Sequence, residues 1–238
     1  SKVIKSSWLS EITYTREFEN KLAKICNRKH AVAFCNATAA MMAGMRALGI
    51  GPGDKVIVPS FSHPADPNCI AAIGANPVFA DVDEETFCLS VQTIEAAKTD
   101  KTKGILLISL YGTTPDLDQI ADYAKKNNLF LIHDCAAALG TQFKGKPATS
   151  YGDFSVLSFF ADKTITTGEG GMLLSDNTDL VVEANIFKHD GGKERGVDII
   201  DRKGYNFRIT ELQSAVGVAQ LKKLDRFIKR KKEILKFY

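Results

Sequence analysis

The chain has 238 residues, of which 45% are hydrophobic and 25% charged, and its formal net charge is +3. A chain of this length can bury a sizeable core and fits one large domain more easily than two. The small net charge gives no reason to expect a nucleic acid partner. No apolar stretch approaches the ~18 uninterrupted residues of a membrane-spanning helix. We therefore expect a globular domain that binds neither nucleic acid nor a membrane.

Short apolar runs alternate with helix-like stretches along almost the whole chain. The predicted strands are 30–34, 55–59, 77–82, 104–112, 129–134, 154–160 and 171–175. The predicted helices are 38–48, 64–73, 90–98, 115–127, 178–188 and 210–237. Continuously apolar strands separated by helices indicate a mostly parallel sheet covered by helices on both faces. A short turn rich in Gly and Thr joins the last two strands, so one antiparallel partner is also expected. We see no linker and predict one α/β domain over residues 1–238.

Parallel sheets of this kind bind ligands beyond the carboxyl ends of their strands. The residues predicted at those ends are Cys35-Asn36-Ala37-Thr38, Ser60-Phe61-Ser62-His63, Tyr111-Gly112, Asp134 and Lys163. One edge of the sheet would thus collect a helix start, an aromatic ring, an acid and an amine. This combination is typical of a site, although each of His63 and Tyr111, taken alone, fits a structural role better than a functional one.

The turn Asn36-Ala37-Thr38 precedes a strongly helix-forming stretch. Free backbone N–H groups and the helix dipole make such a start an anion site. The alternative is that Asn36 or Thr38 simply caps the helix. Neither GxGxxG nor GxxxxGK[ST] occurs in the chain, which argues against dinucleotide or Walker-type nucleotide binding.

Asp134 ends a very apolar strand, where a carboxylate is costly unless a cation or a hydrogen-bond donor meets it. Its alternative role is to cap the segment that follows. A metal pair with His133 is disfavoured, because adjacent strand residues point to opposite faces of the sheet. We therefore predict no metal site.

Lys163 lies in "SFFADKTITTGEGGMLLSD", between an apolar strand and a glycine-rich return. The alternative is an ordinary surface lysine. An amine and an acid beside a helix start match the aldehyde, the pyridine nitrogen and the phosphate of pyridoxal phosphate (PLP), for which proteins use a Schiff-base lysine and an acidic partner.

Five cysteines form no CxxC pair and fit buried, reduced thiols. Residues 1–10 lack the apolar core of a signal peptide, and we expect a cytoplasmic protein. The one basic run, "KKLDRFIKRKK", surrounds an apolar stripe, so we interpret its lysines as the solvated face of a helix. The stripe comprises Leu221, Leu224, Ile228 and Leu235.

The stretches "ALGIGPGDKVIVPSFS", "DKTITTGEGGM" and "GYNFRITELQSAVGVAQLKKLD" resemble segments of the DegT-type sugar aminotransferases. These are PLP enzymes with the fold of aspartate aminotransferase (PLP fold type I), and the resemblance runs nearly end to end. It implies the large, PLP-binding domain of that fold, cut at both ends. The smaller C-terminal domain of the family would lie beyond residue 238.

The resemblance also assigns site residues. Lys163 is similar to the catalytic Schiff-base lysine, and Asp134 to the acid beneath the pyridine nitrogen. Ala37, through its backbone N–H, Thr38 and Ser158 resemble positions that hold the phosphate.

Two further positions carry over from the family. His63 stands where an aromatic ring usually stacks on the cofactor. Asn206 resembles an asparagine that reaches the phosphate of a neighbouring subunit, which implies a homodimer. Three positions depart from the family pattern: Ala37 replaces a glycine, His63 an aromatic residue, and Ala137 a glutamine near the cofactor hydroxyl.

The resemblance implies transfer of an amino group from L-glutamate to a keto-sugar nucleotide, in the biosynthesis of amino sugars for lipopolysaccharide, other surface polysaccharides or natural products. Relatives that dehydrate sugars carry histidine in place of the lysine, so Lys163 argues against that branch. Two alternatives remain. A non-catalytic PLP-binding regulator or structural dimer is favoured by the altered turn at Ala37, by Ala137 and by the missing C-terminal part. Another PLP enzyme of the same fold is disfavoured, because "GYNFRITELQSAVG" resembles the sugar aminotransferases specifically.

Overall fold

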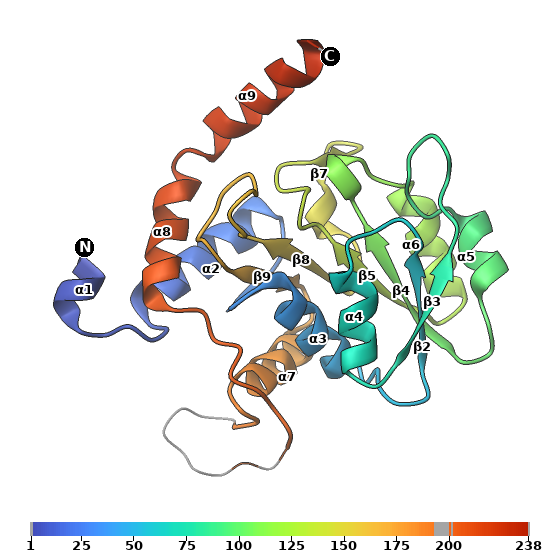
Figure 1. Ribbon diagram of the computed structural model, residues 1–238, viewed down its shortest axis with the longest axis horizontal. Coiled ribbons are helices and arrows are strands. Elements are labelled where there is room, and N and C mark those ends of the chain that lie inside the picture. Colours follow the sequence, from blue (N-terminus) through green and yellow to red (C-terminus); the bar gives the residue numbers. More distant parts are fainter. Residues whose placement is uncertain (1, 193–199, 201, 238) are drawn as a thin grey trace.

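The computed structural model describes residues 2–192, 200 and 202–237 (Figure 1). Its centre is a seven-stranded sheet with the strand order β1-β9-β8-β5-β4-β2-β3. The strands are β1 (His30–Phe34), β2 (Lys55–Pro59), β3 (Asn76–Ala80), β4 (Thr102–Ile108), β5 (Phe130–Asp134), β8 (Phe154–Ser158) and β9 (Gly171–Ser175). All neighbouring strands are parallel except at β9, which is antiparallel to both β1 and β8. The predicted mostly parallel sheet is confirmed.

Helices cover both faces of this sheet, as predicted. Alternate residues of one strand enter different hydrophobic clusters, because successive side chains of a strand point to opposite faces. On β2, Val56 and Val58 join the cluster beneath α3 (Ala37–Ala47), α4 (Ala65–Ala72) and α7 (Thr178–Lys188), whereas Ile57 joins a cluster on the other face. That other face carries α2 (Thr13–Ile25), α5 (Val91–Ala97), α6 (Leu117–Lys126) and α8 (Glu211–Leu221).

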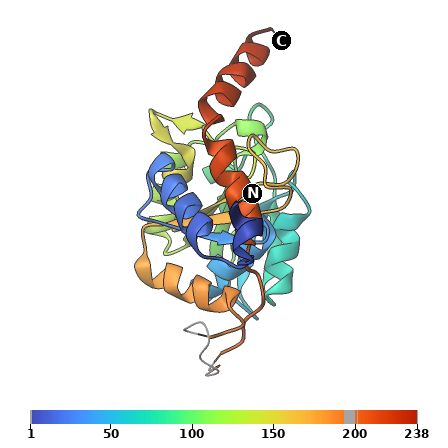
Figure 2. The same ribbon diagram turned by 90° about the vertical axis from the view of Figure 1, so that its left-hand side faces the viewer.

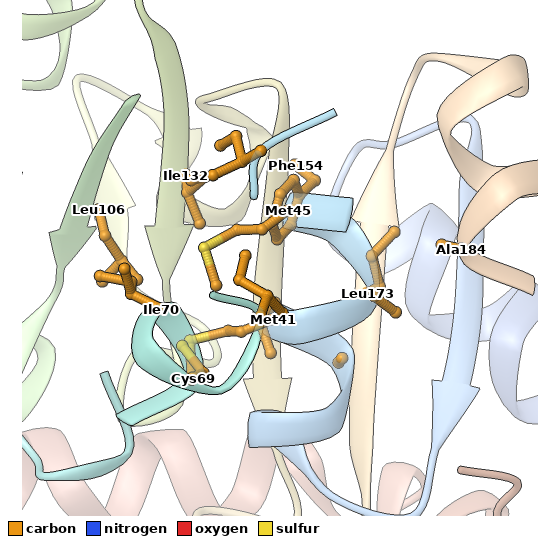
Figure 3. Packing of buried hydrophobic residues seen from close by; sticks show 14 of the residues in the cluster. Met41, Met45, Cys69, Ile70, Leu106, Ile132, Phe154, Leu173 and Ala184 are labelled. Carbon is orange, nitrogen blue, oxygen red and sulfur yellow. The ribbon is translucent and has the colours of Figure 1, made fainter. Parts of the chain in front are cut away.

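The packing of α3 and α4 on the first face fixes the helix starts at one edge of the sheet. Met41 and Met45 of α3 lie between Ile70 of α4 and the side chain of Phe154 from β8 (Figure 3). All four side chains are fully or almost fully buried. Large buried side chains of this kind each contribute roughly 1.5–3 kcal/mol to the free energy of unfolding. This packing fixes the positions of α3 and α4 relative to the sheet.

Helix α2 was not predicted, and its formation depends on the far end of the chain. Ile12 stands at its N-cap and makes no side-chain cap hydrogen bond. Instead, the carboxylate of Glu211 accepts the Ile12 N–H at 3.0 Å and the Thr15 N–H at 3.1 Å. Glu211 opens α8, which lies beside α2 (Figure 2). A partner 196 residues away thus replaces the local cap.

The predicted helix 210–237 is wrong as a single element. The chain bends after α8, and α9 (Leu224–Phe237) projects away from the body (Figure 1). Of the expected apolar stripe, Leu224 is buried but Leu235 is 76% exposed. The stripe therefore packs against the core through Leu221, Leu224 and Ile228, whereas its far end at Leu235 does not. The short helix α1 (Lys2–Ser6), the 3-10 turns at 110–112 and 148–150, and the two-stranded hairpin β6 (Gln142–Phe143) and β7 (Lys146–Pro147) were not predicted either.

Candidate active site

Lys163 lies in the loop between β8 and β9. The predicted strand 154–160 ends two residues early, at Ser158, because the Phe160 N–H turns back to the Ser158 hydroxyl at 3.3 Å. The threonines of the loop close it onto the strand end: Thr166 Oγ1 and the Thr167 N–H both donate to the carbonyl of Phe159. The Lys163 amine reaches only a loose ion pair, 3.7 Å from Asp162, and its side chain is 27% exposed. The loop thus presents a partly shielded amine with no tight partner among the described residues.

Asp134 is the last residue of β5, as predicted, and is 6% exposed. Its Oδ1 accepts the Ala136 N–H at 2.7 Å, so it also caps the turn that follows. Burial raises the pKa of Asp134, while that hydrogen bond, the Asp66 side chain and the charges of Lys163 and His63 act in the opposite direction. Within the described residues, no basic side chain forms an ion pair with Asp134. The site therefore fits a ligand that brings its own cation, as a protonated pyridine nitrogen does.

His133 lies on the other face of β5 from Asp134. It is completely buried, and one ring nitrogen shares a hydrogen bond of 2.8 Å with the Ser109 hydroxyl. Burial lowers the pKa of His133 to about 4. Because the two side chains lie on opposite faces of the sheet, they cannot bind one metal ion together. In the described ranges, no cluster of three or more His, Cys, Asp or Glu could hold a metal ion.

The predicted anion turn forms the start of α3. Asn36 is the helix cap and accepts the Ala39 N–H at 2.8 Å. Capping leaves the first two helical N–H groups, those of Ala37 and Thr38, without an acceptor in the described part of the chain. Both residues are only partly buried. Capping and anion binding are thus compatible, because different N–H groups serve each purpose.

Gly171 lets this turn approach the sheet. It pairs with Phe34 of β1 and with Ser158 of β8. A Cβ atom at residue 171 would lie 2.3 Å from the Asn36 carbonyl carbon and 2.5 Å from the Ala37 nitrogen. The helix start and Ser158 therefore flank one position where only glycine fits. Gly171 thus brings the backbone of the helix start and that of Ser158 to the same strand end.

Gly171→Ala is expected to destabilise the protein by roughly 1–3 kcal/mol, since the new methyl group must displace backbone atoms rather than a flexible side chain. It should also weaken anion binding at the turn. Chemical denaturation and phosphate or PLP titration measure the two effects. Gly145→Ala is the matched control, because no atom lies within 4 Å of a Cβ atom there, although φ is +79° and itself costs stability. Equal stability of Gly171→Ala and wild type would contradict the packing argument.

The remaining predicted residues lie at the rim. His63 is exposed, and its Nδ1 accepts the Ala65 N–H at 3.1 Å, which places the ring at the start of α4. Asn206 is also exposed and lies next to Phe207, whose carbonyl accepts the Cys35 N–H at 2.8 Å. Ala137 is exposed beyond the Asp134 turn. The charge of His63 acts on Asp134. Asn206 lies one residue from Phe207, and that residue's bond to Cys35 brings this segment beside the start of α3.

One residue of this site was missed. Asp66, in the first turn of α4, has an exposed fraction of 0% and lies within hydrogen-bonding reach of Asp134. A signal for its burial was present in the sequence. Cys69, Ile70 and Ile73 follow Asp66 at helical spacing, and this apolar stripe faces the core.

Comparisons with known proteins identify the family of the chain. The sequence model of the DegT/DnrJ/EryC1/StrS aminotransferase family matches residues 1–238. The chain belongs to this family. The DegT-family chain is 43% identical over 242 residues to the GDP-perosamine synthase of Escherichia coli O157:H7, with 100% of this chain and 66% of that protein covered.

Solved structures of similar fold include an aminotransferase from Psychrobacter cryohalolentis, with a TM-score of 0.88 and 36% identity over 93% of this chain and 60% of that one. NtdA from Bacillus subtilis, solved with bound cofactor PMP, has a TM-score of 0.88 and 29% identity, covering 99% of this chain and 56% of its own. The DegT-family chain therefore spans just under two thirds of the curated relative and less of the solved ones. In its described residues, no helix is long and apolar enough to cross a membrane.

Proposed function

We propose that the protein to which this chain belongs is a PLP-dependent aminotransferase that moves an amino group from L-glutamate to a keto-sugar nucleotide. The observation that carries the proposal is the meeting of Lys163, Asp134 and the start of α3 at the carboxyl ends of the strands. Membership of the aminotransferase family and the similarity to a GDP-perosamine synthase support this reaction and this substrate class. The product would be an amino sugar for surface polysaccharides or natural products.

Each residue of the site has a role in this proposal. Pyridoxal phosphate, when bound, supplies an electron sink that stabilises the carbanion formed beside the amino group. Lys163 would hold the cofactor through Nζ, and the same amine would take the proton from the α-carbon of the amino donor. Asp134 would keep the ring nitrogen protonated. The N–H groups of Ala37 and Thr38, with the Ser158 hydroxyl, would bind the phosphate.

The proposal extends to assembly and compartment. We infer a homodimer in which the exposed Asn206 reaches the phosphate in the partner's site, as the family resemblance implies. His63 would lie over the cofactor ring. The five cysteines are free thiols, and four of them are buried, which suits a reducing compartment. We therefore place the enzyme in the cytoplasm.

Incubating the full-length protein with PLP, L-glutamate and a panel of keto-sugar nucleotides tests the proposal. The expected result is 2-oxoglutarate in amounts equal to the aminated sugar, both measured by mass spectrometry. A reaction without any sugar nucleotide is the control and should stop after one turnover per site. A protein that binds PLP but yields no 2-oxoglutarate would be a non-catalytic regulator, and the proposal would be wrong.

A further inference from the structure

Asp66 is a buried acid that the proposed mechanism does not use. Acidic residues in the first turn of a helix normally lie exposed, where they interact favourably with the helix dipole. Asp66 instead has no exposed surface, and neither carboxyl oxygen accepts a hydrogen bond from any described residue. An ionised carboxylate in this position would have lost its water without gaining a partner, which costs several kcal/mol.

The group that faces Asp66 is another acid. The carboxyls of Asp66, from α4, and Asp134, from β5, are within hydrogen-bonding reach of one another. Two carboxylates at such a distance in a buried site cannot both remain ionised. One proton between them removes the repulsion and gives each carboxyl a hydrogen-bond partner.

Other titratable groups surround the pair. His63 precedes α4, and Lys163 lies in the loop after β8; the charges of both favour ionised Asp134. Cys69, one turn further along α4, donates its S–H to the backbone carbonyl of Asp66 at 3.0 Å and not to the carboxyl.

The shared proton belongs on Asp66. Asp134 already accepts the Ala136 N–H, and this hydrogen bond and the charge of the Lys163 amine both oppose the rise in the pKa of Asp134 that burial causes. Asp66 has no such support among the described residues, and burial, together with the charge of Asp134, raises the pKa of Asp66. A cationic pyridine nitrogen at Asp134 would strengthen the same arrangement.

We propose that Asp66 is a positioning residue that remains a neutral carboxylic acid and donates a hydrogen bond to Asp134. This bond, with the one from Ala136, fixes the orientation of the Asp134 carboxylate and leaves its remaining lone pairs for the cofactor ring nitrogen. The part that concerns the cofactor rests on the proposed function. The acid pair itself does not, because it exists without any ligand.

The first test uses the full-length protein without cofactor. Asp66→Asn keeps the shape and a donor but removes the titrating proton, so the infrared band of a protonated carboxylic acid at pH 7 should lose one group. The folded wild type holds this proton at pH values where the unfolded chain, with an aspartate pKa of about 3.9, has released it. Stability from Asp66 is therefore lost as pH rises from about 4 towards the raised folded pKa.

Between pH 5 and 8, the melting temperature of Asp66→Asn should accordingly rise relative to wild type by at least about 3 °C. Asp179→Asn is the matched control, because Asp179 is also the second residue of its helix, α7, but is exposed. It should show no such trend. An unchanged infrared band, or a melting difference of Asp66→Asn that does not vary with pH, would overturn the acid pair.

The second test concerns the cofactor. Asp66→Leu, which lacks a donor, should raise the dissociation constant for PLP about 10- to 100-fold, the range expected for a hydrogen bond to a charged group. Asp66→Asn should stay within about threefold of wild type, because its amide still donates. Equal binding by both variants and wild type would overturn the positioning role. If the wild type itself does not bind PLP, the proposed function fails while the infrared and melting results still decide the acid pair.

Discussion

Lys163→Ala is expected to lower the rate of transamination by at least about 1,000-fold, because one substitution removes both the covalent anchor of the cofactor and the group that moves the proton. The fold should be unaffected. Lys163 is partly exposed and forms only the loose ion pair with Asp162, and such surface substitutions usually change stability by less than about 0.5 kcal/mol. The production of 2-oxoglutarate and the visible absorbance of the bound cofactor measure the loss.

Lys231→Ala is the control for this experiment. The Lys231 amine bonds to Thr164 Oγ1 at 2.9 Å, so it supports the same loop without being the proposed reactive group. It should retain most of the activity. If Lys163→Ala transaminates at the wild-type rate, Lys163 is an ordinary surface lysine and the mechanism is wrong.

Asp134→Ala is expected to weaken PLP binding by about 100-fold and to reduce turnover as well, since removing one partner of a buried charge pair costs about 2–5 kcal/mol. The ring nitrogen would lose the carboxylate that keeps it protonated. Equilibrium titration with PLP and steady-state kinetics measure the two effects separately.

Asp162→Ala is the matched control for Asp134→Ala. It removes the other carboxylate beside Lys163, 3.7 Å from the amine, but its side chain is 70% exposed. Its effect on PLP binding should be no more than about threefold, because exposed ion pairs contribute little. An unaltered dissociation constant and rate in Asp134→Ala would remove the role assigned to this acid.

Much of the sheet and of the site could be predicted because the signals are local. The strands 30–34, 55–59 and 171–175 have the predicted bounds. Asp134 could be located because it ends a buried apolar strand. The turn at Asn36 could be located because a strongly helix-forming stretch begins directly after it. The rule that parallel strands end at one edge then brought them together.

The parts that escaped prediction depend on partners far along the chain. The first N–H groups of α2 donate to the carboxylate of Glu211, and no residue near α2 in the sequence indicates this contact. The second antiparallel pairing of β9, with β1, depends on strand order rather than on the turn before it. Asp66 was overlooked because an acid near a helix start is usually exposed, and only the apolar residues that follow it indicate burial.

The position of β1 at the edge of the sheet, next to a strand far along the chain, affects the order of folding on the ribosome. Among the described residues, β1 pairs with β9 alone, so residues 30–34 have no strand partner until residues 171–175 have been synthesised. At bacterial or eukaryotic elongation rates of about 5–20 residues per second, this gap lasts roughly 7–30 seconds. During this time the start of α3 also lacks its neighbour Gly171, so the anion turn can take its final position only after residue 171 has been made.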